Sequence, residues 1–446
     1  MKPDLSIFAT LAVLLLGMIR VEAQGEEAYE QPPVSYSSAK PHDAVSHLEA
    51  RMASGDLKWV GGGREIVLSL LRELNIPVES QMLVFSKTSF QREIIGPTRP
   101  RALYFSDTSY VGWVPGGLIE VATVDPQLGP VFYSVDPNAA EPGFIRDRSC
   151  LTCHGGQFVR GIPGVFTRSV FTDDAGDPLF RFGSEVVDYQ TPFTNRWAGW
   201  YVTGKHGKAL HRGNVFAQDK DERLVVNLKH GANTADLSKY FPVQSYLTNS
   251  SDIVALLVFE HQTSMQNALT RASMDCRRML AYQKNLQTEL KEPVTEELTY
   301  ESVQHVFDGA AQDVVDNLLF KDEAKLPEGL SGSAAFQTAF GRQAPRANDG
   351  GSLKDLHLAG QLFKNRCSYL IYSESFLELP RELKRRIYAR LARALSPTAP
   401  DARYSYLMAG ERLRISRILQ QTHPEFRRAM GEQSSFTQPK KGVPSL

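Results

Sequence analysis

The segment Cys150-Leu-Thr-Cys-His154 carries two thiols three positions apart and an imidazole directly after the second thiol. Two thiols at this spacing can add to the vinyl groups of a porphyrin, and the adjacent imidazole can bind the iron. The pattern is typical of a haem c attachment site. It predicts Cys150 and Cys153 as thioether anchors, His154 as the proximal iron ligand, and one haem c per chain.

Two other kinds of site begin with the same residues. The pair of thiols is half of a structural zinc site, which His206 and His211 would have to complete. A thiol–disulfide exchange site needs a strand-to-helix setting that the surrounding sequence does not show. The other two cysteines, Cys276 and Cys367, are far apart and supply no second close pair. They are candidates for a disulfide, a question that their sequence positions leave open.

The ligand on the far side of the iron would decide the chemistry of a bound haem. Four side chains are candidates. His206 and His211 lie in a glycine-bearing segment, and His261 and Met265 lie one helical turn apart on an apolar stripe. The competing interpretation is a solvated loop position for the first two and a buried structural role for the last two. Because no methionine lies between His154 and Met265, the sequence favours a histidine or an open position.

Other residues near the motif could support a haem without binding its iron. Cationic side chains can neutralise the propionates, although a solvated loop position explains them equally well. The three that flank the motif are Arg146, Arg148 and Arg160. Aromatic side chains can pack on the porphyrin, although ordinary core packing is the commoner role. The three in question are Trp197, Trp200 and Tyr201.

The composition excludes some partners. The chain has 446 residues, of which 42% are hydrophobic, and its 50 basic side chains balance 50 acidic ones. A balanced charge gives no electrostatic reason for binding nucleic acid or an anionic membrane surface. We therefore expect a globular protein with no nucleic-acid partner.

The first residues have the pattern of a signal peptide. Lys2 precedes an apolar run from Ile7 to Ile19, and small residues at Val21 and Ala23 follow. The run is shorter than the roughly 20 residues that span a bilayer. We expect cleavage near Ala23 and a mature chain in the periplasm or otherwise outside the cytoplasm, without a transmembrane segment. Haem c is attached in that compartment.

The pattern of apolar, branched and turn-forming residues predicts an α+β fold, with a β-rich N-terminal part that carries the motif and a mostly α-helical C-terminal half. The expected segments, in chain order, are a signal peptide at 1–23, a flexible lead-in at 24–40, a β-rich haem-binding region at 41–233, a long-helix region at 234–325, a linker or long loop at 326–352, a C-terminal helical region at 353–433 and a disordered tail at 434–446.

Individual elements follow from the spacing of apolar residues. Helices are expected at 42–53, 65–74, 251–290, 353–363, 380–395 and 409–421. Strands are expected at 82–86, 101–106, 117–124 and 130–135, and after the motif within 164–173, 178–188 and 197–204. The motif itself is expected on a short helical turn.

The sequence around the motif resembles a group of large secreted bacterial cytochrome c-like proteins with a single haem motif. The segments that carry the resemblance are "DRSCLTCHGGQ", "GWYVTGKHGKALHRGN" and "SLKDLHLAGQLFKNRCSYLIYSESF". The likeness extends over roughly residues 80–420. These proteins have no assigned substrate, so the resemblance implies a cofactor and not a reaction. The residues that carry over are Cys150, Cys153 and His154.

The leading hypothesis is a secreted c-type haem protein that transfers electrons to or from a redox partner protein. The alternative is an open sixth position at the iron, which would suit an oxidase- or peroxidase-type enzyme or a gas-binding sensor. A second alternative is a structural zinc site at Cys150 and Cys153. Both enzyme and non-enzyme roles are thus consistent with the sequence.

Overall fold

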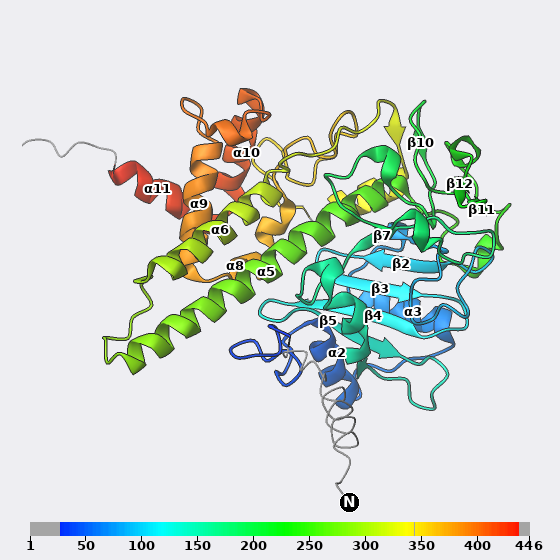
Figure 1. The fold of residues 1–446 in the computed structure, drawn as a ribbon, viewed down its shortest axis with the longest axis horizontal. Coiled ribbons are helices and arrows are strands. Elements are labelled where there is room, and N and C mark those ends of the chain that lie inside the picture. The colour runs from blue at the N-terminus through cyan, green and yellow to red at the C-terminus, as the bar shows by residue number, and fades with distance from the viewer. Residues whose placement is uncertain (1–26, 343, 437–446) are drawn as a thin grey trace, which may run out of the picture.

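The structure is a computed structural model that describes residues 27–342 and 344–436. The expected signal peptide at 1–23 lies outside the described residues, as does the tail beyond 436. Strands gather into a large antiparallel sheet in the N-terminal half, and helices dominate the C-terminal half (Figure 1). This arrangement confirms the mixed helix-and-strand prediction at the level of the two halves.

Seven strands, each rich in branched or aromatic residues, form the sheet in the order β6-β5-β4-β3-β2-β1-β9, and all neighbours are antiparallel. They are β1 (Met82–Val84), β2 (Arg101–Phe105), β3 (Ser109–Trp113), β4 (Ile119–Asp125), β5 (Gly129–Val135), β6 (Ile145–Arg146) and β9 (Trp200–Tyr201). Short strands outside this sheet are β7 (Thr167–Ser169), β8 (Glu185–Val187), β10 (Lys205–His206), β11 (Gln218–Lys220), β12 (Arg223–Val225) and β13 (Leu330–Ser331).

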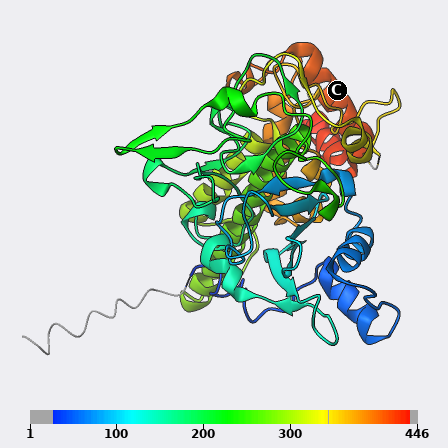
Figure 2. The same ribbon diagram turned by 90° about the vertical axis from the view of Figure 1, so that its right-hand side faces the viewer.

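The two faces of the sheet belong to two different cores, because successive side chains of a strand point to opposite sides. One face buries Leu83, Val111 and Tyr133 together with residues of the helices α2 (Ala44–Ala53) and α3 (Gly63–Glu73). The other face packs against a long helix, α5 (Ile253–Glu289), in a core that also contains residues of the C-terminal helices. In both views the C-terminal helices lie apart from α2 and α3 (Figures 1 and 2).

Helix α5 (Ile253–Glu289) runs along the sheet and extends beyond it (Figure 1). The carboxylate of Asp252 begins the helix, because it accepts hydrogen bonds from the backbone N–H groups of Val254 and Ala255. The remaining helices are α6 (Glu301–Leu318), α7 (Ala334–Gly341), α8 (Glu374–Leu377), α9 (Arg381–Ala394), α10 (Ala409–Thr422) and α11 (Pro424–Phe436). None of the helices in the described part of the chain has both the length and the hydropathy needed to cross a membrane.

Most of the strongly patterned elements are confirmed. The helices expected at 42–53, 65–74, 251–290, 380–395 and 409–421 are α2, α3, α5, α9 and α10, and every expected strand segment contains a strand. The helix expected at 353–363 is wrong. There the chain doubles back, with His357 N–H donating to Leu362 O at 2.9 Å and Lys364 N–H to Asp355 O at 2.8 Å. A tight reversal buries Leu353 and Phe363 without a helix.

The segment expected to be a flexible lead-in and the one expected to be a linker or long loop both contribute to the core. Tyr29, Val34 and Tyr36 of the presumed lead-in are buried, and the Tyr36 hydroxyl donates to Pro130 O at 2.8 Å. The presumed linker at 326–352 contains α7, whose Phe336 and Phe340 enter the main core. In both segments a few apolar anchors hold a stretch whose overall composition is polar or rich in glycine. Helix α11 likewise continues to 436, into the presumed tail.

Asp43 joins α2 to the sheet, so its loss should weaken the fold. Its carboxylate accepts from Ser46 N–H at 2.9 Å, from the Thr123 hydroxyl at 2.6 Å and from the Tyr133 hydroxyl at 2.8 Å. Asp43→Ala removes a helix cap and leaves two buried hydroxyls without an acceptor. We expect the free energy of unfolding in urea to fall by about 2–4 kcal/mol. The exposed Asp56→Ala should change it by less than about 0.5 kcal/mol, and equal stability of the two variants would contradict the assignment.

Candidate functional site

The motif lies on a short helical stretch directly after the edge strand β6. The chain passes through a 3₁₀ turn at Arg148–Cys150 into the helix α4 (Leu151–His154). Asp147 starts this turn, since its carboxylate accepts from Ser149 N–H at 2.9 Å. The stretch ends at Gly155, where a side chain would come within 2.5 Å of the Tyr29 hydroxyl. The predicted short helical turn is therefore confirmed.

Both motif thiols are free and half-buried. Cys150 packs against the core between the sheet and α5. Burial, together with Asp147 and Glu120, raises the pKa of the Cys150 thiol to about 12, an effect that Arg101 opposes. The thiol is therefore protonated at neutral pH. Because positions three apart share one side of a helix, Cys150 and Cys153 can reach the same edge of a ligand.

His154 is held so that one ring nitrogen is available to a metal. Its Nδ1 lies 2.8 Å from Gly164 O, and because a carbonyl only accepts, Nδ1 carries the proton and Nε2 keeps a free electron pair. The ring lies between Phe132 and Phe166, at centroid distances of 4.9 and 5.1 Å. Burial lowers the pKa of His154 to about 4, an effect that the contact with Gly164 opposes. The imidazole is thus neutral at pH 7, as metal binding requires.

Helix α5 fixes the loop that holds this histidine. The side chain of Asn267 accepts from Val165 N–H at 3.1 Å and donates to Val165 O at 2.8 Å. A Cβ on Gly164 would lie 2.6 Å from Asn267 Oδ1, so only glycine allows this close approach. The carbonyl that orients His154 is therefore positioned by a residue more than 100 positions further along the chain.

The motif side chains do not converge on one point. Among the residues that the structure describes, no group of three or more His, Cys, Asp or Glu side chains is arranged to hold a metal ion directly. A closed zinc site needs four converging ligands. A haem needs only the histidine to reach the iron, while the thiols reach the porphyrin edge. The donor set fits haem attachment better than zinc binding.

His206 and His211 lie together, 4.5 Å apart between ring centroids, in a separate part of the fold. The Nδ1 of His206 contacts Ala209 O at 2.7 Å, and its Nε2 accepts from Asn233 N–H at 2.7 Å, so both ring nitrogens are used. His211 accepts from Gly213 N–H, and burial lowers its pKa to about 3. Both side chains are buried, so neither occupies the solvated loop position that was the competing interpretation.

His261 and Met265 are fully buried in the core around α5. His261 Nε2 lies 2.8 Å from the Ser368 hydroxyl, and its ring stacks on Phe320 at a centroid distance of 3.9 Å. Its Nδ1 has no hydrogen-bond partner within the described chain. These contacts match the buried structural role. None of the aromatic contacts of the four distal candidates involves His154 or the rings that enclose it.

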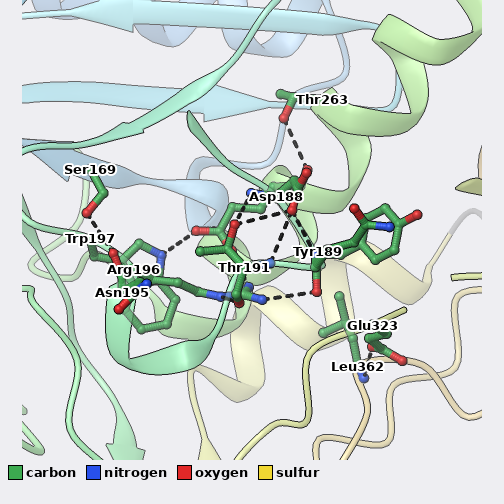
Figure 3. Close-up of polar contacts among 12 residues, drawn as sticks. Ser169, Asp188, Tyr189, Thr191, Asn195, Arg196, Trp197, Thr263, Glu323 and Leu362 are labelled. Carbon is green, nitrogen blue, oxygen red and sulfur yellow. Dashed lines mark hydrogen bonds and ion pairs between the residues drawn. The ribbon is translucent and has the colours of Figure 1, made fainter. Parts of the chain in front are cut away.

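Trp197 belongs to a buried polar cluster (Figure 3). Its indole N–H donates to Glu260 Oε1 at 2.6 Å, and Arg196 Nη1 meets Glu260 Oε2 at 2.5 Å. Burial raises the pKa of Glu260 to about 7, while Arg196 and Trp197 lower it. The cluster ties the loop before β9 to α5. Trp197, Trp200 and Tyr201, for which core packing was the commoner role and contact with a porphyrin the alternative, are all core residues.

The flanking arginines differ in their availability. Arg146 donates to Ala39 O and Tyr36 O and lies over the Tyr36 ring, so it anchors the N-terminal segment. Arg148 and Arg160 are exposed. Arg168 was not predicted. Its guanidinium lies between two phenyl rings, at 4.6 and 4.8 Å from their centroids, and those rings belong to Phe158 and Phe180.

A cavity of about 590 Å³ adjoins the loop that orients His154. Phe158, Val165 and Phe166 line it from the motif side, and Asn267 and Arg271 line it from α5. This volume lies within the range of small-molecule sites. Its walls come from segments more than 100 residues apart, so no local sequence signal could have revealed it.

Comparison with known proteins adds no relative: no protein-family model, curated protein or solved structure matches the chain significantly. The functional interpretation therefore depends on the chemistry of the residues described above.

The buried His261 should make the fold sensitive to acid. Burial lowers its pKa to about 3, whereas an unfolded histidine titrates near pH 6.5. Below that pH the unfolded state binds a proton that the folded state does not, so stability falls as the pH falls. Between pH 7.5 and 5.0 this group should account for a loss of about 2 kcal/mol. For His261→Gln, the fall in the free energy of unfolding in urea between pH 7.5 and 5.0 should be smaller by about 2 kcal/mol.

The exposed His230 provides the matched control. His230→Gln should keep the wild-type dependence of unfolding free energy on pH. If His261→Gln also keeps it, the neutral buried state assigned to His261 is wrong.

Proposed function

We propose that the protein is an extracytoplasmic c-type haem protein that transfers electrons, with haem c attached at Cys150 and Cys153 and His154 as its proximal ligand. The observation that carries this proposal is the state of His154, whose Nδ1 contacts Gly164 O and whose Nε2 keeps a free electron pair. Ligating histidines in metal sites are fixed in this way, by a hydrogen bond from the nitrogen that does not bind the metal.

Other features of the chain hold the imidazole in place, keep it neutral and provide the covalent anchors. Phe132 and Phe166 enclose the imidazole and restrict its rotation. The lowered pKa keeps His154 neutral across the physiological range, so protonation does not compete with metal binding. The two thiols lie one helical turn apart on the same short stretch and provide the covalent anchors. When bound, haem c supplies a one-electron couple between ferrous and ferric iron.

A second candidate function is binding of a small molecule at the iron. The placement of the four distal candidates favours it, because each is buried in packing or hydrogen bonding away from the motif. An open sixth position would admit a diatomic gas or peroxide.

Covalent attachment can be tested directly. Protein produced together with the c-type haem maturation machinery should carry haem that stays with the chain on a denaturing gel, detected by its peroxidase stain. Replacing both anchors, Cys150→Ser with Cys153→Ser, should abolish the stain because no thioether can form. Cys276→Ala is the matched control, since Cys276 is buried in the core and should leave the stain unchanged. A blank wild-type band would refute the proposal.

Carbon monoxide distinguishes the two candidate functions. A saturated electron-transfer iron should leave the spectrum of the reduced protein unchanged for minutes after addition of the gas, because a ligand must first dissociate. A rapid shift without denaturation would instead favour the second candidate. Met265→Leu should change neither result, since Met265 is packed in the core and its volume is nearly conserved.

A further inference from the structure

Beside the motif, one face of the sheet changes from apolar to small and polar. Directly paired positions form a row across the sheet, and one such row is Leu103, Gly112, Glu120 and Ser134. The next row on the same face is the apolar one beneath α5, formed by Phe105, Tyr110, Ala122 and Phe132. Phe132 contacts His154, while Leu103 and Cys150 pack against the same core. The polar row therefore adjoins the haem motif.

An ion pair crosses this polar row. Arg101 Nη2 on β2 lies 2.5 Å from Glu120 Oε2 on β4, so the two side chains meet above the intervening strand β3. At the crossing point β3 has Gly112, where a Cβ would lie 2.7 Å from Arg101 Nη2 and 3.0 Å from Glu120 Oε2. A side chain at this position would therefore displace the two groups from the positions they have here. The two side chains are 21% and 24% exposed, so solvent screens them only in part.

Both charges act on the motif. Burial has the largest influence on the pKa values of Cys150 and His154, and beyond it Arg101 lowers both values while Glu120 raises both. The strand register places the pair near the motif independently of these effects. Glu120 lies two residues before Ala122 on the same face of β4, and Ala122 is paired with Phe132, whose ring contacts His154. In addition, Arg101 Nε is buried and has no hydrogen-bond partner among the described residues. The Arg101 guanidinium therefore keeps one N–H group without an acceptor among the described residues.

On the basis of the proposed function, we infer that Arg101 and Glu120 flank the edge of the haem attached at Cys150 and act in opposite directions on the reduction potential of its iron. Oxidation of ferrous iron gives one electron to the redox partner and leaves one more positive charge at the iron. A nearby cation disfavours that charge, and a nearby carboxylate favours it. Paired across Gly112, the two opposing influences largely cancel.

The test is to unbalance the pair in each direction and measure the reduction potential of the purified haem-loaded protein. Glu120→Gln leaves the cation alone and should raise the potential. Arg101→Gln leaves the carboxylate alone and should lower it. The double variant should return close to the wild-type value. Opposite shifts that cancel cannot arise from a general loosening of the fold, which would move both single variants in the same direction.

The control is an ion pair of similar exposure remote from the sheet. Lys384 on α9 meets Glu425 on α11 at 2.9 Å, with side chains 15% and 30% exposed. Glu425→Gln should leave the potential unchanged. If Glu120→Gln does not fold, Glu120→Gln combined with Arg101→Lys retains an unpaired cation on a more flexible side chain, and the same rise is expected.

Failure of this inference can be told apart from failure of the proposed function. If the wild type and the single variants carry covalent haem by gel stain and all have the same potential, the inference is overturned and haem attachment stands. If the wild type carries no covalent haem, the proposed function itself is overturned.

Discussion

The proposed chemistry depends on the contact between His154 Nδ1 and the carbonyl of Gly164, 2.8 Å apart. A histidine side chain without this contact could protonate either ring nitrogen and rotate about its side-chain bonds. The contact sets one tautomer and one orientation. It also requires that the carbonyl itself be immobile, and Asn267 provides this by bonding both backbone groups of Val165. The tautomer and orientation of His154 therefore depend on α5, through Asn267.

Helix α5 can serve this purpose because it is itself held by polar contacts along its length. Asp252 caps its first turn, and Glu260 bonds Arg196 and Trp197 in a buried cluster. A buried ion pair of this kind adds little net stability, but loss of either partner would leave an uncompensated charge. The ion pair contributes here by fixing the position of the helix. It fixes the helix relative to the loop before β9, and the same helix then presents Asn267 to the motif.

The sequence predicted those features whose signal is local. The five-residue motif predicts its own cofactor class. The spacing of apolar residues identified α5 and α9, and runs of branched and aromatic residues identified β1, β2, β4 and β5, whereas β3 was missed. The same reasoning failed where apolar residues are few and irregular, as for Tyr36 and Phe336, which are buried within segments of polar or glycine-rich composition. It also failed at 353–363, because a chain reversal can bury Leu353 and Phe363 at a spacing that resembles a helix.

The site beyond the motif could not be predicted, because its parts are brought together only by tertiary structure. Asn267 carries no sequence mark that links it to position 164. Arg101 and Glu120 become neighbours only through the register of three strands and the absence of a side chain at Gly112. A small motif would suffice to attach a cofactor. The large sheet and the long helix are needed for what attachment alone does not supply, which is a fixed imidazole and a defined set of charges around it.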